Sequence, residues 1–290
     1  ESINTGHENK LFLPTIALDP AIRATGDLGI LAACDALLVV TPAQHMRATL
    51  AAMPRLSVPL VLCAKGIEEG STRLMHEVAA EAQPDCPIAV LSGPTFADEV
   101  AKGLPTALTL AVEDSGIGEA LRARLARPAF RPYLSDDIVG AEIGGAVKNV
   151  LAIACGVVEG SGLGQNARAA LISRGFAEMT RFGLARGGRA ETLAGLSGLG
   201  DLVLTCSSSS SRNFSLGKGL GEGRNASELL SDRKTVAEGA YTAPVLKRAA
   251  DAAGIDMPIV DAVCALLSGA LSVDEVVERL LARPLRSEGF

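Results

Sequence analysis

The segment DALLVVTP (35–42) decides the fold class, because it is a short apolar run that ends at a proline. Two further runs of this kind follow, PLVLCAKG (59–66) and PIAVLSGP (87–94). Strands that are apolar on both faces are typical of parallel sheets covered by helices. The stretches between them, 43–56 and 72–83, have the composition of helices. Alternating strands and helices predict a doubly wound parallel, Rossmann-like sheet.

The alternation ends near residue 137. TALTLAVE (106–113) predicts another strand, 117–127 a helix and RPYLSDD (131–137) a short last strand. Only helical patterns follow, at 138–160, 167–188, 212–221, 242–253, 258–269 and 273–282. We therefore predict two domains, an α/β domain over 1–137 and a mostly helical domain over 138–290.

Composition excludes several classes of protein. Lys and Arg total 27 against 33 Asp and Glu, and the net charge of −6 argues against a general nucleic-acid binder. No apolar stretch approaches the ~18 residues that a membrane-spanning helix needs. With three His, six Cys and no C-x-x-C pair, a metal site is not expected. Most cysteines lie in apolar runs, which predicts buried free thiols and a cytoplasmic protein.

Two neighbouring strands end in residues suited to binding. Cys63-Ala64-Lys65-Gly66 closes one predicted strand and Ser92-Gly93-Pro94-Thr95-Phe96-Ala97 the next. In open α/β sheets, ligands bind at the carboxyl ends of the strands. Each segment alone also fits an ordinary strand exit with a solvated lysine or a helix cap, but two adjacent ones favour a site.

Three polar groups stand out in the helical half. Lys148 and Asn149 lie in an apolar helix behind Gly144 and Gly145, where a charge is costly unless it is paired or functional. A lysine whose side chain reaches the surface explains Lys148 equally well.

The other two groups follow Gly-rich or Ser-rich stretches. Asp201 lies in a Gly-rich apolar turn, and Ser211-Arg212-Asn213 opens a helix as an anion site would. A helix cap and a solvated loop are the alternative explanations.

A Gly-rich phosphate loop is missing. Gly162-x-Gly164-x-x-Ala167 matches the dinucleotide pattern by letter, but it lies between two predicted helices and not after a strand. It predicts a helix–helix turn. The chain opens at Glu1 within the pattern, so we expect an internal fragment or a trimmed protein.

These pieces, in this order, resemble the bacterial type of NAD(P)-dependent glycerol-3-phosphate dehydrogenase. The strings that carry the resemblance run over nearly the whole chain: HENKLFLP (7–14), VVTPAQ (39–44), AKGIE (64–68), LSGPTFADEV (91–100), GGAVKNVLAIACG (144–156), NARAALISRG (166–175), GLGDLVLTC (198–206), SSRN (210–213) and VAEG (236–239). The departure is at the start, where the family has a strand and a G-x-G-x-x-G turn. The absence of that element would weaken cofactor binding and catalysis.

The resemblance implies domain roles, a reaction and a site. Residues 1–137 would be a truncated dinucleotide-binding domain that lacks its first element, and residues 138–290 the helical substrate and catalytic domain. Such enzymes interconvert dihydroxyacetone phosphate and sn-glycerol 3-phosphate with NAD or NADP, and their product feeds phospholipid synthesis. Lys148 would be the general acid and base, its pKa lowered by burial and a nearby arginine. The substrate would be bound by Lys65, Gly93, Thr95, Lys148, Asp201, Ser211, Arg212 and Asn213. The cofactor would be bound by Lys65, Ala97, Arg212, Val236 and Glu238.

Other functions stay open at this point. One is a dehydrogenase of the same architecture that acts on a 3-hydroxy acid or on 6-phosphogluconate, against which GLGDLVLTC and SSRN argue. Another is a folded but non-catalytic chain that acts in binding or assembly. The expected partner is a phosphorylated triose or glycerol, with no nucleic acid, no membrane span and a possible homodimer.

Overall fold

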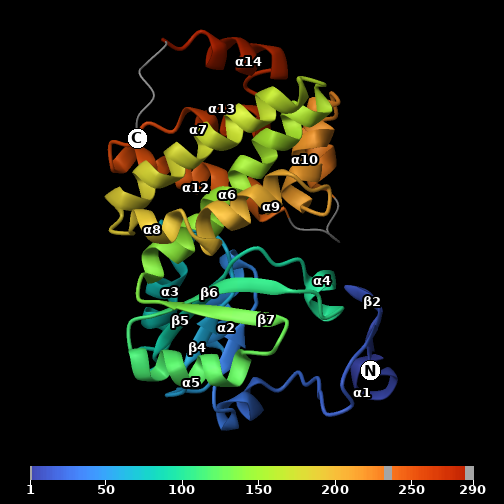
Figure 1. Cartoon of the computed structure of the whole chain (residues 1–290), viewed down its shortest axis with the longest axis vertical. Coiled ribbons are helices and arrows are strands. Elements are labelled where there is room, and N and C mark those ends of the chain that lie inside the picture. The colour runs from blue at the N-terminus through green and yellow to red at the C-terminus, as the bar shows by residue number, and fades with distance from the viewer. Residues whose placement is uncertain (1, 232–236, 285–290) are drawn as a thin grey trace.

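The computed structural model describes residues 2–231 and 237–284 as a sheet domain below a helical domain (Figure 1). The strands are β1 (Glu8–Asn9), β2 (Leu13–Ala17), β3 (Leu37–Val39), β4 (Leu60–Leu62), β5 (Ile88–Ser92), β6 (Thr106–Val112) and β7 (Phe130–Ser135). The helices of the first half are α1 (Ser2–Gly6), η1 (Leu28–Ala33), η2 (Ala43–His45), α2 (Met46–Ala51), α3 (Met75–Ala82), α4 (Ala97–Ala101) and α5 (Ser115–Leu125). Those of the second half are α6 (Ile138–Gly160), α7 (Gly164–Ala185), α8 (Ala190–Leu193), η3 (Leu196–Gly200), α9 (Asp201–Cys206), α10 (Arg212–Gly221), α11 (Ala226–Leu230), α12 (Glu238–Ala252), α13 (Pro258–Leu267) and α14 (Val273–Leu281).

The main sheet has the order β3-β4-β5-β6-β7. Strands β3, β4 and β5 are parallel, which confirms the expected Rossmann-like arrangement. Strand β6 differs, because it runs antiparallel to β5, with Ser92 opposite Thr109, while β7 is parallel to β6. A parallel return needs a crossover of about a dozen residues or more, usually a full helix. The connection after β5, residues 93–105, is long enough for a crossover but holds only the five-residue α4 and no helix that covers the sheet, and β6 begins at the edge where β5 ends.

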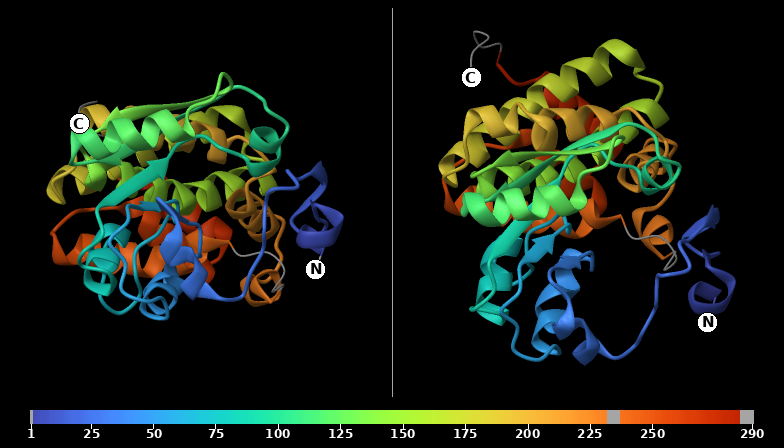
Figure 2. Two further views of the ribbon diagram at one scale, coloured as in Figure 1. Left: turned by 90° about the horizontal axis from the view of Figure 1, so that it is seen from below. Right: turned by 60° about the horizontal axis from the view of Figure 1, so that its bottom comes forward.

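Most predicted elements are present but shorter. The helix expected over 43–56 is divided into η2 and α2 and ends at Ala51, because Pro54 disfavours helical backbone in the residue before it. The hairpin β1–β2, the short helices α1, α4, α8, α9 and α11, and η1 and η3 were not expected. Figure 2 shows that α1 and the hairpin lie to one side of the sheet domain. The Gly162–Gly164 segment is the expected turn between helices α6 and α7, where both glycines have positive φ.

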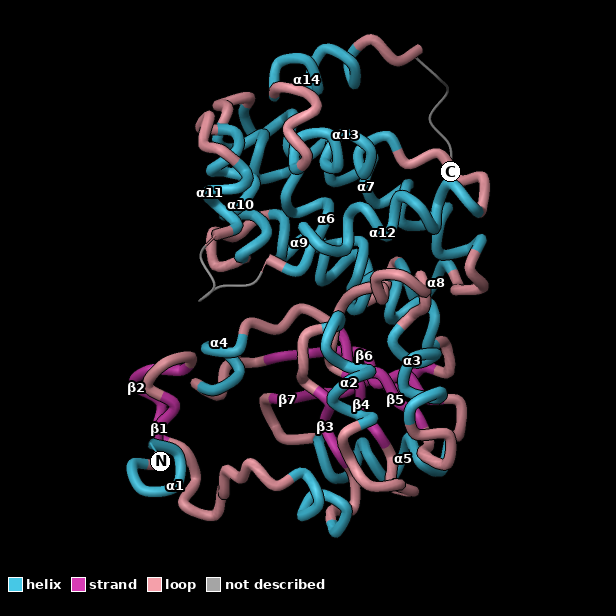
Figure 3. The backbone as a smooth tube through the Cα atoms, turned by 180° about the vertical axis from the view of Figure 1, so that it is seen from behind, coloured by secondary structure: helices cyan, strands magenta, loops and turns pink. Residues whose placement is uncertain are grey.

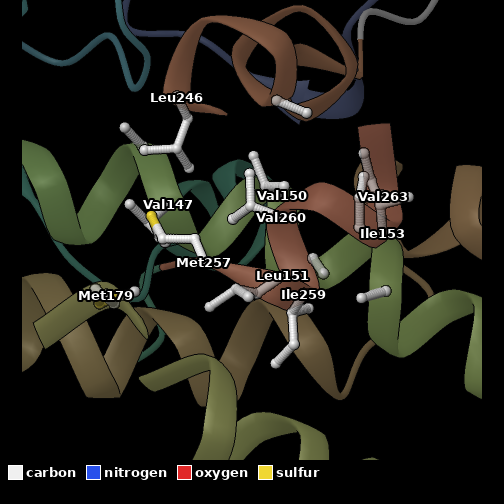
Figure 4. Close-up of a cluster of buried hydrophobic side chains, with 14 of the residues drawn as sticks. Val147, Val150, Leu151, Ile153, Met179, Leu246, Met257, Ile259, Val260 and Val263 are labelled. Atoms are coloured by element: carbon white, nitrogen blue, oxygen red, sulfur yellow. The ribbon is translucent and has the colours of Figure 1, made fainter. Parts of the chain in front are cut away.

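Helix α6 is the centre of the second domain and packs against α7, α9, α10, α12 and α13, whereas α14 lies at the far end beyond α13 (Figure 3). It begins at Asp137, whose carboxylate accepts hydrogen bonds from the N–H groups of Gly140 and Arg189, both at 2.8 Å. Its Val and Leu side chains pack against α12 and α13, as Figure 4 shows for Val147 and Val150 beside Leu246 and Val260. By length and composition α6 could cross a membrane, but 94% of its most apolar window is buried inside the protein. It is therefore a core helix.

Small residues let α10 lie directly on α6. A Cβ atom at Gly156 would come within 2.1 Å of the Phe214 carbonyl oxygen, and one at Gly217 within 1.9 Å of that of Ile153. The two backbones are thus in contact, which brings the start of α10 alongside the middle of α6.

The cysteines only partly follow the expectation. All six are free thiols, and Cys86, Cys155 and Cys206 are buried as expected, whereas Cys34 is exposed. The exposure of Cys34 follows from its place in the loop between η1 and β3, outside both cores.

Candidate active site

Two lysines converge on one aspartate between the domains. Lys148 Nζ on α6 donates to Asp201 Oδ1 at 2.7 Å, and Lys65 Nζ, after β4, donates to Asp201 Oδ2 at 2.6 Å. The Asp201 side chain is 1% exposed, that of Lys148 is 8% exposed and that of Lys65 is 19% exposed. The charge on Lys148 is therefore paired and buried, and the alternative of a surface lysine is wrong.

Close packing of backbone places Asp201 opposite Lys148. A Cβ atom at Gly144 would lie 2.5 Å from the Ser197 carbonyl oxygen, so the turn η3 rests directly on α6 one helical turn before Lys148. Gly198 in turn packs on the carbonyl of Leu193, 1.9 Å from where its Cβ would be. This turn leads straight into α9, whose first residue is Asp201. The glycines before Lys148 and Asp201 are thus explained by backbone contact.

The environment of Lys148 tunes its acidity. Burial, as the largest cause, and the nearby positive charge of Lys65 lower its pKa to about 8, against the opposing effect of Asp201. The expected arginine is not the source of the positive charge, because the loop after β4 brings Lys65 to the same carboxylate. A lysine with a pKa near neutrality can both give and accept a proton at physiological pH.

Thr205 is a further member of this cluster, which was not predicted from the sequence. Lys148 Nζ donates to Thr205 Oγ1 at 2.8 Å, and that hydroxyl lies 3.2 Å from Asp201 Oδ1. The two residues are four apart on α9, so they share one helix face. Recognising DLVLTC as a helix would have found it. An ammonium has three N–H donors, so two fixed partners leave Lys148 one donor for a ligand.

The sheet side of the cluster is formed at the ends of β4 and β5. Lys65 Nζ also donates to the Gly93 carbonyl oxygen at 3.2 Å. Gly93 has no room for a side chain, because its Cβ would lie 2.8 Å from the Cα of Leu108 on β6. The hydroxyl of Thr95 donates to the same carbonyl at 3.2 Å. The two strand ends therefore meet, as their position on parallel neighbours predicts.

A second pair of polar residues links α10 to α6. Asn213 Nδ2 donates to Asn149 Oδ1 at 3.1 Å, next to Lys148 in the chain. Asn213 Oδ1 accepts from the N–H of Gly239 at 2.9 Å, next to Glu238. This buried asparagine thereby joins α6, α10 and α12.

Glu238 connects the two domains. It is the first residue of α12, and its Oε1 accepts from the N–H of Ala43 after β3 at 3.3 Å. Burial raises the pKa of its carboxyl, while the positive charges of Arg212, Lys65 and Lys148 act in the opposite direction. Arg212, exposed at the start of α10, is thus within electrostatic reach of Glu238.

The remaining predicted residues have fewer contacts. The Ser211 hydroxyl is buried and accepts from the Phe214 N–H at 3.2 Å, which makes it the N-cap of α10. Ala97 is the first residue of α4 and offers no polar side chain. Val236 lies outside the described residues.

The carboxyl ends of the strands fit the dinucleotide that the resemblance implies. Thr41, after β3, has a buried hydroxyl with no hydrogen-bond partner among the described residues. Such a group costs free energy until a ligand or water satisfies it. With Lys65 after β4 and Glu238 facing β3, these strand ends offer the hydroxyl, ammonium and carboxylate groups that bind ribose and amide functions.

Comparison with known proteins assigns a relationship to both halves. A family model described as the N-terminus of NAD-dependent glycerol-3-phosphate dehydrogenase matches residues 1–117. The corresponding model of the C-terminus matches residues 137–278. Together the two models account for most of the chain.

Similar proteins are known from sequence and from structure. A protein of Erythrobacter litoralis, named as an NAD(P)+ glycerol-3-phosphate dehydrogenase, is 65% identical over 99% of this chain and 86% of its own length. One of Novosphingobium aromaticivorans with the same name is 64% identical over 99% of this chain and 87% of its own. The crystal structure of glycerol-3-phosphate dehydrogenase from Coxiella burnetii matches with a TM-score of 0.92 and 38% identity, over 97% of this chain and 88% of that one.

Proposed function

Because the chain belongs to the NAD-dependent glycerol-3-phosphate dehydrogenase family, we propose that its Lys65–Asp201–Lys148 cluster is the catalytic centre of that reaction. The activity is the NAD(P)-dependent interconversion of dihydroxyacetone phosphate and sn-glycerol 3-phosphate. The single observation that carries the site is a lysine that is buried, paired and lowered in pKa to about 8 at the meeting point of the two domains.

Lys148 is the proton donor in the reducing direction. Its two fixed hydrogen bonds, to Asp201 and Thr205, hold Nζ in place and leave one N–H for the carbonyl oxygen of the substrate. As negative charge develops on that oxygen, the proton passes from Nζ to it, and Lys148 becomes a neutral amine. In the oxidising direction the neutral amine takes the proton of the substrate hydroxyl.

Asp201 and Lys65 act in opposite directions on the pKa of Lys148. Asp201 stabilises the charged form of Lys148, and Lys65 opposes it. The result is a group poised between acid and base, whereas an isolated buried ammonium would lose its proton outright. Lys65 also lines the substrate from the sheet side, together with Gly93 and Thr95.

Substrate recognition on the helical side is assigned to Ser211, Arg212 and Asn213. Free N–H groups at a helix start favour an anion, and the Arg212 guanidinium adds a full charge there. The positive charges of Lys65, Lys148 and Arg212 act together on Glu238, which supports a local cationic cluster in a chain of net charge −6. Such a cluster suits a dianionic phosphate ester.

The nicotinamide cofactor supplies or accepts the hydride when it is bound. Lys65, Ala97, Arg212, Val236 and Glu238 are assigned to it by resemblance. The Thr41 hydroxyl, which has no partner within the described part of the chain, supports the same edge of the sheet. Glu238 on α12 accepts a hydrogen bond from the N–H of Ala43 after β3, which supports a cofactor site between the two domains.

The cellular setting is proposed from the family and from the chemistry of the chain. The product, glycerol 3-phosphate, suits the synthesis of phospholipids. A cytoplasmic location is supported by the bacterial relatives and the six free thiols, and a homodimer is the proposed assembly.

Steady-state assays test the proposed function. The protein is expected to oxidise NADH or NADPH, followed at 340 nm, when dihydroxyacetone phosphate is added. Two further assays separate it from related dehydrogenases: acetoacetate or unphosphorylated dihydroxyacetone replaces dihydroxyacetone phosphate in the NAD(P)H assay, and 6-phosphogluconate is tested in the oxidising direction with NAD+ or NADP+. Equal rates with dihydroxyacetone phosphate and with unphosphorylated dihydroxyacetone would contradict the proposed function. Activity on acetoacetate alone would contradict it as well.

A further inference from the structure

The position of Lys65 depends on the loop that follows it. Ile67 and Leu74 are fully buried and belong to the core of the helical domain, although they lie between β4 and α3 of the sheet domain. The two residues form an antiparallel bridge with each other. The loop from Lys65 to Leu74, here called the β4–α3 loop, therefore belongs to the sheet domain but packs into the core of the helical domain.

Gln44 binds the β4–α3 loop through both the nitrogen and the oxygen of its side-chain amide. Its Nε2 donates to the Ile67 carbonyl oxygen at 2.8 Å, and its Oε1 accepts from the Glu69 N–H at 2.8 Å. Gln44 lies in η2, which is separated from the end of β3 by three residues, so it binds the β4–α3 loop from within the sheet domain. One residue before it, the Cβ of Ala43 would lie 2.7 Å from a Cβ at Gly66, which leaves no space between the two segments.

A second contact supports the same attachment. Arg47, three positions after Gln44, binds the Glu68 carboxylate through both Nε and a terminal nitrogen, each at 2.8 Å. The hydrogen bond from Arg47 is the main reason why the pKa of Glu68 is lowered. Residues 67, 68 and 69 are thus all bound by two side chains from η2 and the start of α2.

We propose that Gln44 is a positioning residue that holds Lys65 in its catalytic geometry. The proposal rests on the proposed function, in which Lys65 acts on the substrate and on Asp201. Lysine has a long, flexible side chain, so Nζ meets the Gly93 carbonyl and Asp201 only if its backbone is fixed. The Gln44 amide fixes that backbone two residues downstream, without itself touching Lys148, Asp201 or Lys65 in any contact found among the described residues.

The chain contains a matched control. Gln83 has the same kind of clamp: its Nε2 donates to the carbonyl oxygens of Leu50 at 2.9 Å and Pro54 at 3.2 Å, and its Oε1 accepts from the Leu56 N–H at 3.0 Å. The loop it binds carries no site residue. Gln44→Met and Gln83→Met each remove one clamp and keep a side chain of similar size.

The experiment compares kcat/KM and thermal melting of both variants. Gln44→Met is expected to lower kcat/KM by about 10- to 100-fold, the scale for a small displacement of a site group. Whichever of kcat and KM changes more in Lys65→Ala should also change more in Gln44→Met. Gln83→Met is expected to lower the melting temperature at least as much and to leave kcat/KM unchanged. Equal kinetic effects in the two variants, or no effect in Gln44→Met, would overturn the proposal.

A double-mutant cycle tests whether Gln44 acts through Lys65. In the Lys65→Ala background, Gln44→Met should change kcat/KM by less than about twofold, because the group it positions is gone. If the effects of Gln44→Met and Lys65→Ala on kcat/KM are additive, the positioning role of Gln44 is overturned, while the assignment of Lys65 stands. If Lys65→Ala itself leaves kcat/KM unchanged, the assignment of Lys65 under the proposed function is the part that fails. Should Gln44→Met not fold, Gln44→Glu, which keeps the acceptor for the Glu69 N–H, is measured with the same outcomes.

Discussion

Lys148 and Asp201 are 53 positions apart in the chain, yet their side chains lie 2.7 Å from each other in the buried centre of the molecule. Their contact joins the long core helix α6 to the short helix α9, and Lys65 joins the same carboxylate from the sheet domain. The Asp201 carboxylate on α9 therefore binds lysines from two other segments of the chain.

Removal of the Lys148 amine should abolish most of the chemistry. Lys148→Ala is expected to lower kcat by at least ~10²-fold, the usual effect of losing a general acid, with a smaller change in KM. Steady-state kinetics on folded protein measures this. Lys218→Ala, at a half-exposed lysine of α10 paired with Glu222, is the control and should keep the wild-type kcat. A near-normal kcat in Lys148→Ala would show that the proton comes from another group.

The kcat of the reducing reaction and the kcat of the oxidising reaction should change with pH in opposite directions. With a pKa of about 8, Lys148 is protonated below that pH and neutral above it. Reduction needs the protonated form, so its kcat should fall as the pH rises past about 8, whereas the kcat of oxidation should rise over the same range. Rate profiles from pH 6 to pH 10 measure both. The residual activity of Lys148→Ala should lack this inflection, and a shared inflection would point to a different titrating group.

Arg212 should matter mainly for affinity. Arg212→Ala is expected to raise the KM for dihydroxyacetone phosphate about tenfold or more, since a charged hydrogen bond contributes roughly 1.5–3 kcal/mol. The effect on kcat should be smaller, because the phosphate is bound in both the ground and the transition state. Arg212→Lys should recover part of the affinity. Arg224→Ala, at an exposed arginine paired with Glu228, should behave as wild type. A loss confined to kcat would contradict a binding role.

The contact between α6 and α10 should be sensitive to a single methyl group. Gly217→Ala places a Cβ 1.9 Å from the Ile153 carbonyl oxygen, so the helices must separate. Overpacking of this kind costs about 1–3 kcal/mol of unfolding free energy, and the KM should rise as Asn213 moves from Asn149. Urea denaturation measures the stability. Gly26→Ala, where no atom lies within 4 Å of the added Cβ, is the matched control and should be nearly neutral. Equal stability of the two variants would refute the close approach.

Local sequence was enough for the parallel core of the sheet and for α6. The apolar runs 35–42, 59–66 and 87–94 predict strands β3 to β5 because only a sheet covered on both faces buries them. The direction of β6 was not predicted, because it depends on whether the connection after β5 crosses the sheet, and the residues of that connection do not specify this. Elements of five or six residues such as α4 and α9 were missed as well, because so short a window carries no clear helical period.

For the site, the sequence by itself supplied the unusual residues: a lysine in an apolar helix, a carboxylate in a glycine-rich turn, and a polar triplet at a helix start. The resemblance gave them roles. Only the tertiary structure decided that Asp201 binds two lysines, that Lys65 and not an arginine opposes the charge on Lys148, and that Thr205 and Gln44 belong to the arrangement. The physical reason is that charge pairing and backbone packing act over a few ångströms in space, and sequence spacing does not specify which distant segments come that close.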